Sequence, residues 1–148
     1  MRYFRCLWKR RDCNIKRPSC STKRCNFITK KSLMIQDQVK EFNDYRSRMN
    51  ELILSKDNLV IKRLWNLDTN TYAEGALDIK TKELLGLVAS MVLRCDDCIK
   101  YHLGKAHELK VTTEEMYELF AVANIVGGTI IVPHTRRAAE YWEALNKV

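Results

Sequence analysis

The side chains best suited to chemistry in this sequence are two cysteines, Cys95 and Cys98, and a histidine, His102, four residues further on. If a helix begins at Cys95, these spacings of three and four residues place all three side chains on one helical face. The unpaired N–H groups and the positive dipole end at a helix start stabilise a thiolate, which lowers the thiol pKa. His102 can then act as a base for Cys98. Glu83, twelve residues before Cys95, reaches the same site and polarises His102 if its helix packs antiparallel to the next.

The same cysteine pair has simpler interpretations, which the spacing leaves open. Two cysteines three residues apart are often small buried residues, or half of a zinc site. A zinc site built on Cys95, Cys98 and His102 needs a fourth ligand, for which His107 and His134 are the candidates. His107 lies five residues beyond His102, off the common face, and no second closely spaced cysteine pair occurs in the globular part. We therefore predict no bound metal.

Nearly all of the sequence after residue 32 has the apolar spacing of amphipathic helices. We expect helices over residues 33–54, 59–67, 77–93, 95–109, 112–126 and 133–145. A connection with a turn or short helix inside it is expected over 68–75. Thr112 followed by Glu115 has capping-box spacing, and Gly127 with Gly128 fits a helix end. No alternating polar and apolar run is long enough for a sheet. The sequence therefore predicts an all-α domain.

The positive charge of the chain, formally +8, is concentrated in its first residues. Residues 1–31 hold eleven of the 26 lysines and arginines against one acidic residue, Asp12. The remainder is slightly acidic, so a groove that binds nucleic acid is not expected there. No apolar run approaches the roughly 20 residues that span a bilayer, so no membrane partner is expected either.

Composition also divides the chain into two parts. Residues 1–33 are predicted to be a basic, disordered leader or the product of a mis-assigned start, with Met34 as the true start. Residues 34–148 are predicted to form one helical domain. The cysteines of the leader lack the close pairing of zinc sites; they are Cys6, Cys13, Cys20 and Cys25.

The pattern of Glu83, eleven residues, Cys-x-x-Cys, three residues and His resembles the AhpD-like, carboxymuconolactone decarboxylase superfamily. An Ala/Val helix, a Gly-Gly break and a final helix follow in the same order as in that superfamily. The resemblance covers roughly residues 38–148, and the tract ELLGLVASMVLRCDDCIKYHLGKAHE is especially close to small, single-domain members. It implies an AhpD-like helical domain of about five to six helices that packs into a homo-oligomer, commonly a trimer or hexamer.

The resemblance also implies a role for each site residue. In AhpD-like members the second cysteine of the motif is oxidised by hydroperoxide and the first closes the disulfide. Carried over, Cys98 is peroxidatic, Cys95 is resolving and proton-donating, and His102 with Glu83 forms the proton relay. One position departs from AhpD, because Asp97 stands where AhpD has a second histidine. An anion at that position raises the thiol pKa and slows attack on peroxide.

The sequence thus predicts a thiol peroxidase or disulfide oxidoreductase that cycles a Cys95–Cys98 disulfide, with a hydroperoxide or disulfide as substrate. An external dithiol regenerates the pair, and no cofactor is expected, since the sequence has no Gly-rich phosphate loop. A persistently reduced pair needs a reducing compartment, so we expect a cytoplasmic protein. Two alternatives stay open: an acid–base enzyme that uses Glu83 and His102 on a small organic acid such as a lactone, and a non-enzymatic helical oligomer with or without a stabilising zinc.

Overall fold

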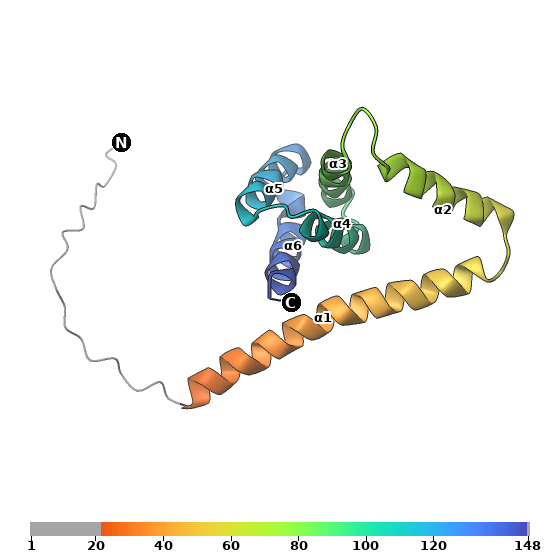
Figure 1. The fold of residues 1–148 in the computed structure, drawn as a ribbon. Coiled ribbons are helices and arrows are strands. Elements are labelled where there is room, and N and C mark those ends of the chain that lie inside the picture. The colour runs from red at the N-terminus through yellow and green to blue at the C-terminus, as the bar shows by residue number, and fades with distance from the viewer. Residues whose placement is uncertain (1–21, 148) are drawn as a thin grey trace, which may run out of the picture.

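The computed structural model describes residues 22–147, with side chains from residue 38 onward. The described residues form six α-helices and one short 3-10 helix, without a strand. The prediction of an all-α fold is therefore confirmed. In Figure 1, helices α3 to α6 gather into a bundle, the long helix α1 passes along one side, and α2 extends from the bundle edge. No helix in the described range is long and apolar enough to cross a membrane.

Helix α1 (Thr22–Leu54) is the longest element and begins earlier than the apolar pattern predicts. The prediction placed its start at residue 33, whereas the helix runs back to Thr22, inside the segment predicted to be a disordered leader. The stretch contains neither Gly nor Pro, so nothing in its sequence stops the helix at residue 33. The rest of the predicted leader, residues 1–21, lies outside the described residues. The domain boundary at residue 33 stays a prediction.

Helix α2 (Leu59–Tyr72) also differs from the prediction, which ended it at residue 67 and placed a connection with a turn or short helix over 68–75. Asn58 caps the helix, since its side-chain oxygen accepts two first-turn N–H groups at 3.0 and 3.1 Å. Beyond residue 67 the polar side chains bond along the helix instead of ending it. The hydroxyls of Thr69 and Thr71 donate to carbonyl oxygens four residues earlier. The helix therefore continues to Tyr72.

Helices α3 (Ile79–Val92) and α4 (Asp96–Glu108) pack against each other and are joined by a tight turn. Arg94 in this turn has a left-handed backbone with φ of 61°. The N–H of Cys95 donates to the carbonyl oxygen of Ser90 at 3.0 Å, which is the bond of a Schellman motif. This turn determines where the cysteine motif at the start of α4 lies relative to α3.

The remaining elements are α5 (Thr113–Gly127), the 3-10 helix η1 (Thr129–Ile131) and α6 (Val132–Leu145). The capping box expected at residues 112–115 is present at the start of α5, with both reciprocal bonds between Thr112 and Glu115. Gly128, with φ of 72°, ends α5. Pro133 lies in the first turn of α6, where its missing N–H costs no hydrogen bond.

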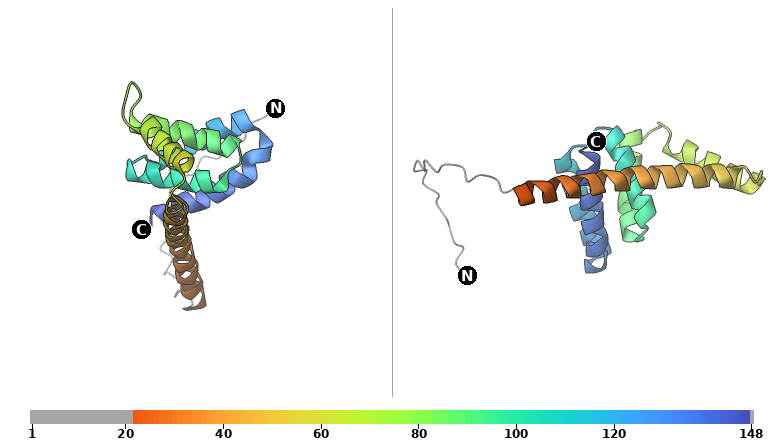
Figure 2. Two further views of the ribbon diagram at one scale, coloured as in Figure 1. Left: turned by 90° about the vertical axis from the view of Figure 1, so that its right-hand side faces the viewer. Right: turned by 90° about the horizontal axis from the view of Figure 1, so that it is seen from below.

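The core lies between α3, α4, α5 and α6. Its largest fully buried side chains are Leu87, Met91, Leu103, Met116, Ile131 and Trp142. Helix α1 crosses the bundle against α6 (Figure 2), where Phe42 meets the ring of Tyr141 edge-on at 6.1 Å. Helix α2, by contrast, has no buried residue. Among the described residues only three buried side chains are polar or charged, namely Glu83, Ser90 and His102.

Candidate active site

The cysteine motif occupies the start of α4. Cys95 is the capping residue, Cys98 lies in the first turn, and a disulfide joins them with the Cα atoms 5.3 Å apart. The side chain of Cys95 makes no capping hydrogen bond, so the amides of the first turn are available to stabilise a negative charge on sulfur. Cys98 is exposed, whereas Cys95 is half-buried. A molecule arriving from solvent therefore meets the sulfur of Cys98 first.

A buried carboxylate and imidazole lie one turn further along. His102 Nδ1 is 2.7 Å from Oε2 of Glu83, and both side chains are less than a tenth exposed. Glu83 comes from α3, so the packing of α3 on α4 brings together two residues nineteen apart in the sequence. With Nδ1 donating to the carboxylate, Nε2 is the nitrogen that can accept a proton. The antiparallel return that the sequence analysis required is present.

Two tyrosines and a glycine surround the imidazole of His102, and the sequence analysis did not single them out. The ring of Tyr72 lies 5.4 Å from the imidazole, and that of Tyr101 lies 5.2 Å from it. Gly86 makes room for them, since a Cβ there would lie 2.6 Å from Oη of Tyr72 and 2.9 Å from Nε2 of His102. Burial raises the pKa of both tyrosines, and the charge of Glu83 raises it further. Both phenols therefore stay protonated at neutral pH and can donate a hydrogen bond.

A cavity of about 320 Å³ opens beside Cys98 and His102. Helix α1 supplies one wall of it, with Phe42, Tyr45, Arg46, Met49 and Asn50. The guanidinium of Arg46 lies 4.0 Å from the ring centroid of Tyr101, a cation–π contact that ties this wall to α4. Asp68 of α2 completes the lining. The volume suits a small organic molecule.

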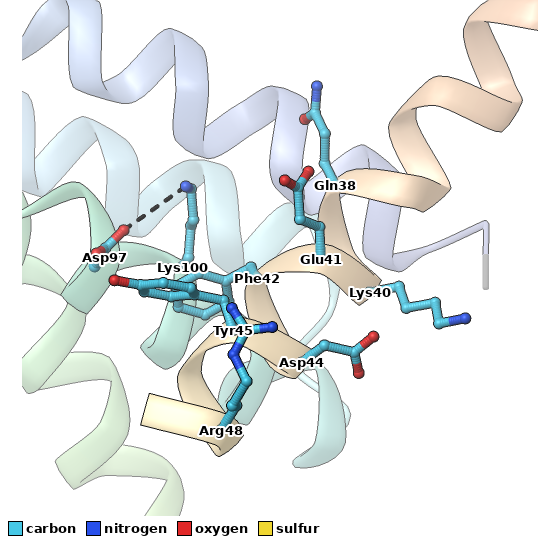
Figure 3. Close-up of a pocket in the computed structure, with 9 residues that line it drawn as sticks. All are labelled: Gln38, Lys40, Glu41, Phe42, Asp44, Tyr45, Arg48, Asp97 and Lys100. Atoms are coloured by element: carbon cyan, nitrogen blue, oxygen red, sulfur yellow. Dashed lines mark ion pairs between the residues drawn. The ribbon is translucent and has the colours of Figure 1, made fainter. Parts of the chain in front are cut away.

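A wider groove of about 700 Å³ continues from this cavity between α1 and α4. Figure 3 shows its two sides, and the cavity and the groove share Phe42, Tyr45 and Asp97. Lys100 of α4 reaches across toward α1, with Nζ 5.2 Å from the ring centroid of Phe42. The route from solvent to Cys98 is therefore bounded by α1 on one side and by the first turns of α4 on the other.

The two aspartates between the cysteines have different surroundings. Oδ1 of Asp96 lies 2.7 Å from Nδ1 of His134, and its Oδ2 lies 3.1 Å from Nη2 of Arg137. Both partners belong to α6. Asp97 is instead 76% exposed and pairs with Lys100 at 3.8 Å (Figure 3). Of the two acids, Asp96 alone is held by another helix.

Each histidine considered as a fourth zinc ligand contacts another side chain. His107 packs edge-on against Trp142 with the ring centroids 5.9 Å apart, and His134 contacts Asp96. Within residues 22–147 no group of three or more His, Cys, Asp or Glu side chains is arranged to hold a metal ion. The structure does bond Glu83 to His102, and one cavity is lined by both His102 and Cys98. Their catalytic roles stay predictions.

This arrangement has three components that together permit thiol chemistry. The cysteine pair can store two electrons by opening and closing its disulfide. The Glu83–His102 pair can hold and release a proton at Nε2. The cavity connects one member of each pair, Cys98 and His102, to solvent.

Comparison with known proteins identifies the family. The model of the Carboxymuconolactone decarboxylase family matches residues 59–141, more than half of the chain, and that range contains Glu83, Cys95, Cys98 and His102. The chain therefore belongs to the carboxymuconolactone decarboxylase family, which confirms the predicted resemblance.

Two curated relatives match over part of the chain. An uncharacterized protein of Cupriavidus necator is 30% identical over 73 residues, which is 49% of this chain and 65% of that protein. Uncharacterized protein 4 in the cox locus of Paracoccus denitrificans is 31% identical over 67 residues, which is 45% of this chain and 60% of that protein. The chain thus spans less than two thirds of the length of either relative.

Solved structures match over more of the chain. A Thermotoga maritima protein is 49% identical with a TM-score of 0.71, over 73% of this chain and 95% of that one. A second structure of it, at 48% identity and a TM-score of 0.69, is named as a family protein with a suggested part in an antioxidative response. A family protein of Legionella pneumophila is 30% identical with a TM-score of 0.50, over 79% of this chain and 96% of that one.

Proposed function

We propose that this protein is a thiol-dependent peroxidase or disulfide oxidoreductase that cycles the Cys95–Cys98 disulfide. One observation carries the proposal: the pair lies at a helix start, one turn before a histidine whose Nδ1 is bonded to a buried carboxylate. The cavity beside Cys98 gives a small oxidant access to that sulfur. The antioxidative role in the name of the Thermotoga maritima protein supports the same chemistry.

In the oxidative half of the cycle, Nε2 of His102 takes the proton of the Cys98 thiol. The thiolate attacks one oxygen of the hydroperoxide, an S–O bond forms as the O–O bond breaks, and the leaving alkoxide takes a proton and departs as an alcohol. Cys98 is then a sulfenic acid. The sulfur of Cys95 attacks it, the disulfide closes, and the hydroxyl of the sulfenic acid leaves as water with the proton of Cys95. One hydroperoxide thus removes two electrons from the pair.

In the reductive half, an external dithiol returns the two electrons. Its thiolate attacks the exposed sulfur of Cys98, forms a mixed disulfide and releases Cys95 as a thiolate, which takes up a proton. The second thiol of the reductant then attacks the mixed disulfide and releases Cys98. The reductant leaves as its own disulfide. The helix start stabilises each thiolate as it is released.

The test follows the cysteines directly, because Arg94 and Lys100 flank the motif and trypsin releases Cys95–Lys100 as one peptide. Reduced full-length protein is mixed with one equivalent of hydroperoxide and quenched with an alkylating agent over seconds to minutes. We expect the peptide to convert rapidly to an unalkylated internal disulfide. Cys98→Ser should abolish the conversion, and His102→Ala should slow it by about 10²–10⁴-fold, the usual contribution of a positioned base.

A matched pair of variants distinguishes the effect of the buried Glu83 carboxylate from the effect of removing any acidic side chain. Glu83→Gln keeps the shape of the side chain but removes its charge beside His102, so it should slow disulfide formation. Glu108→Gln changes an exposed acid that pairs with Lys105 at the other end of α4, and it should leave the rate unchanged. If the pair stays alkylated while other thiols oxidise equally fast, the proposed function is wrong.

One further observation favours a second candidate. His102, which bonds to Glu83, lines an open cavity in a fold whose family is named for a decarboxylase. Acid–base chemistry on a small organic acid such as a lactone is therefore the alternative. In that case Cys98→Ser keeps most of the activity on the organic acid, whereas His102→Ala abolishes it. The redox proposal requires both variants to lose activity on hydroperoxide.

We also propose that the protein assembles into a homo-oligomer, a trimer or hexamer. Helix α2 supports this, because its apolar side chains Leu59, Val60, Leu64 and Leu67 are each more than half exposed. Light scattering coupled to gel filtration measures the mass in solution. Leu64→Lys should lower that mass, because it places a charge on the face of α2 that the proposed oligomer covers. A monomeric mass for the unchanged protein would contradict the proposal.

A further inference from the structure

The start of α4 holds more negative charge than a thiolate site tolerates well. Cys95 caps the helix, Cys98 lies in its first turn, and Asp96 and Asp97 stand between them. The free amides of this turn stabilise a thiolate, but a nearby carboxylate repels it and raises the thiol pKa. The charges of Asp96 and Asp97 therefore disfavour a thiolate at this position unless nearby positive groups compensate them.

The two carboxylates are compensated to different degrees. Asp97 points into solvent, where water screens its charge, and its one ion pair is the long contact to Lys100 (Figure 3). Asp96 is less exposed and bonds to two cationic or polar groups of α6. Nη2 of Arg137 lies 3.1 Å from Oδ2 and 3.3 Å from Oδ1 of Asp96, and 2.9 Å from Nδ1 of His134.

Asp96 keeps its negative charge at neutral pH. Partial burial raises the pKa of this carboxyl, but the hydrogen bonds with His134 and Arg137 outweigh burial and hold the pKa below its usual value. Cys95 therefore has a negative charge beside it at neutral pH, and the guanidinium of Arg137, which stays protonated, balances that charge.

We propose that Arg137, together with His134, is a positioning residue for the cysteine pair: it neutralises Asp96 at the start of α4, so that a thiolate formed there is not repelled. The inference rests on the proposed redox function of that pair. The inference also bears on position 97, where this chain has an aspartate and AhpD has a histidine. The positive charge that Asp97 cannot provide comes from Arg137 of α6 instead.

Other charged and titratable groups lie near the pair and form the background of the test. Those that line the cavity beside Cys98 are Arg46 on α1, Asp68 on α2, and Tyr101 and His102 on α4. Glu83 on α3 bonds to His102, and Arg94 directly precedes Cys95 in the chain. None of them contacts Asp96 in the hydrogen bonds and ion pairs of the described residues. Changing Arg137 therefore alters the charge balance at Asp96 and leaves this background in place.

The experiment measures the thiol pKa of the reduced full-length protein without any oxidant. The rate at which iodoacetamide first alkylates the peptide containing Cys95 and Cys98 is recorded from pH 5 to 10 at low salt. Arg137→Ala should raise the thiol pKa by about half a unit to one unit, as expected for one charge several ångströms away. Below the pKa, that shift lowers the thiolate fraction by about three- to tenfold.

The chain offers a matched control and a charge-restoring pair. Arg136→Ala removes an equal charge from the neighbouring, exposed position of α6 and should leave the profile unchanged. Asp96→Asn should lower the thiol pKa, and the double variant Asp96→Asn/Arg137→Ala should return close to the original value. If the substitutions only loosened the structure, the thiol pKa would shift in the same direction in both single variants. The two shifts would then not cancel in the double variant. An unshifted Arg137→Ala profile, or a double variant that keeps the shift, overturns the inference.

Two further measurements keep the outcome clear. Thermal unfolding checks that each variant is folded. If Arg137→Ala does not fold, Arg137→Lys replaces it. Arg137→Lys keeps the charge and should keep the pH profile of alkylation, whereas Asp96→Asn should still lower the thiol pKa. Because alkylation needs no peroxide, the two proposals fail separately. If the thiol pKa shifts as expected but peroxide forms no disulfide, the redox function alone is refuted. If peroxide forms the disulfide rapidly but Arg137→Ala leaves the thiol pKa unchanged, the role of Arg137 alone is refuted.

Discussion

Gly86 is the position where one added methyl group tests the geometry of the site most directly. It lies in α3, and a Cβ there would stand 2.6 Å from Oη of Tyr72 and 2.7 Å from Cε1 of His102. Ordinary contacts begin near 3.4 Å, so Gly86→Ala forces these atoms to move by roughly 0.7–0.8 Å. Tyr72 is half-buried at a helix end and can swing away. His102 is buried and tied to Glu83, so its displacement strains that bond.

The two consequences of Gly86→Ala have different magnitudes. Overpacking costs about 1–3 kcal/mol of unfolding free energy, and the better helix propensity of Ala recovers about 1 kcal/mol, which leaves a net loss of about 0–2 kcal/mol. The chemical rate is more sensitive, because a misplacement near 1 Å costs on the order of 10²-fold. We therefore expect disulfide formation to slow by about 10–100-fold in a protein that remains folded.

Gly104 supplies the control for this prediction. It also lies inside a helix, α4, but nothing stands within 4 Å of a Cβ built there. Gly104→Ala should therefore raise the unfolding free energy by about 1 kcal/mol and leave the rate unchanged. The rate is followed by alkylation of the Cys95–Lys100 peptide after one equivalent of hydroperoxide, and stability by urea unfolding. If Gly86→Ala behaves like Gly104→Ala in both assays, the close approach at His102 is wrong.

Three further predictions concern stability. Burial raises the pKa of Tyr141 from 10.0 to about 12, so stability is full below pH 10 and falls as pH rises toward 12, by about 2–3 kcal/mol for this group. Tyr141→Phe should remove that part of the fall in urea midpoints between pH 9 and 12, and an unchanged slope would contradict the assignment. Lys110 has a left-handed backbone with φ of 59°, so Lys110→Gly should raise the unfolding free energy by about 0.5–1 kcal/mol, whereas Lys110→Ala should not. Nζ of Lys82 donates to the carbonyl oxygens of Thr71 and Ala73 at 3.0 and 2.6 Å, and α2 has no buried residue. Lys82→Met should therefore speed amide hydrogen exchange in the last turn of α2 while α4 stays protected. Equal exchange in Lys82→Met and the unchanged protein would show that this contact does not hold α2.

The helix ends that were predictable are those that side chains mark. The capping box at residues 112–115 and Gly128 bracket α5, and both act as their residue types indicate. The start of α1 and the end of α2 were missed because nothing there stops a helix. In α2, Thr69 and Thr71 satisfy their hydroxyls along the helix itself, so polar composition did not signal a connection.

The candidate site divides in the same way. Local spacing within α4 and one antiparallel turn were enough to bring Glu83, His102 and the cysteine pair together. Gly86 did carry a signal, since an isolated glycine inside an apolar helix often marks a close approach. Tyr72 and Arg46 had none, because they reach the site from α2 and α1, whose placement depends on packing over long sequence separations.

The wall that α1 builds against Cys98 has a consequence for how such a protein changes over time. The match to the family covers residues 59–141, which hold every residue proposed to react, whereas Phe42, Tyr45 and Arg46 lie before that range. Part of the cavity wall thus lies outside the stretch that holds the residues proposed to react, whereas Asp68, Asp97 and Tyr101 line the cavity from within that stretch. Substitutions in α1 can therefore change the shape of the cavity beside Cys98, and with it the set of molecules that fit there, while Glu83, His102 and the cysteine pair stay unchanged.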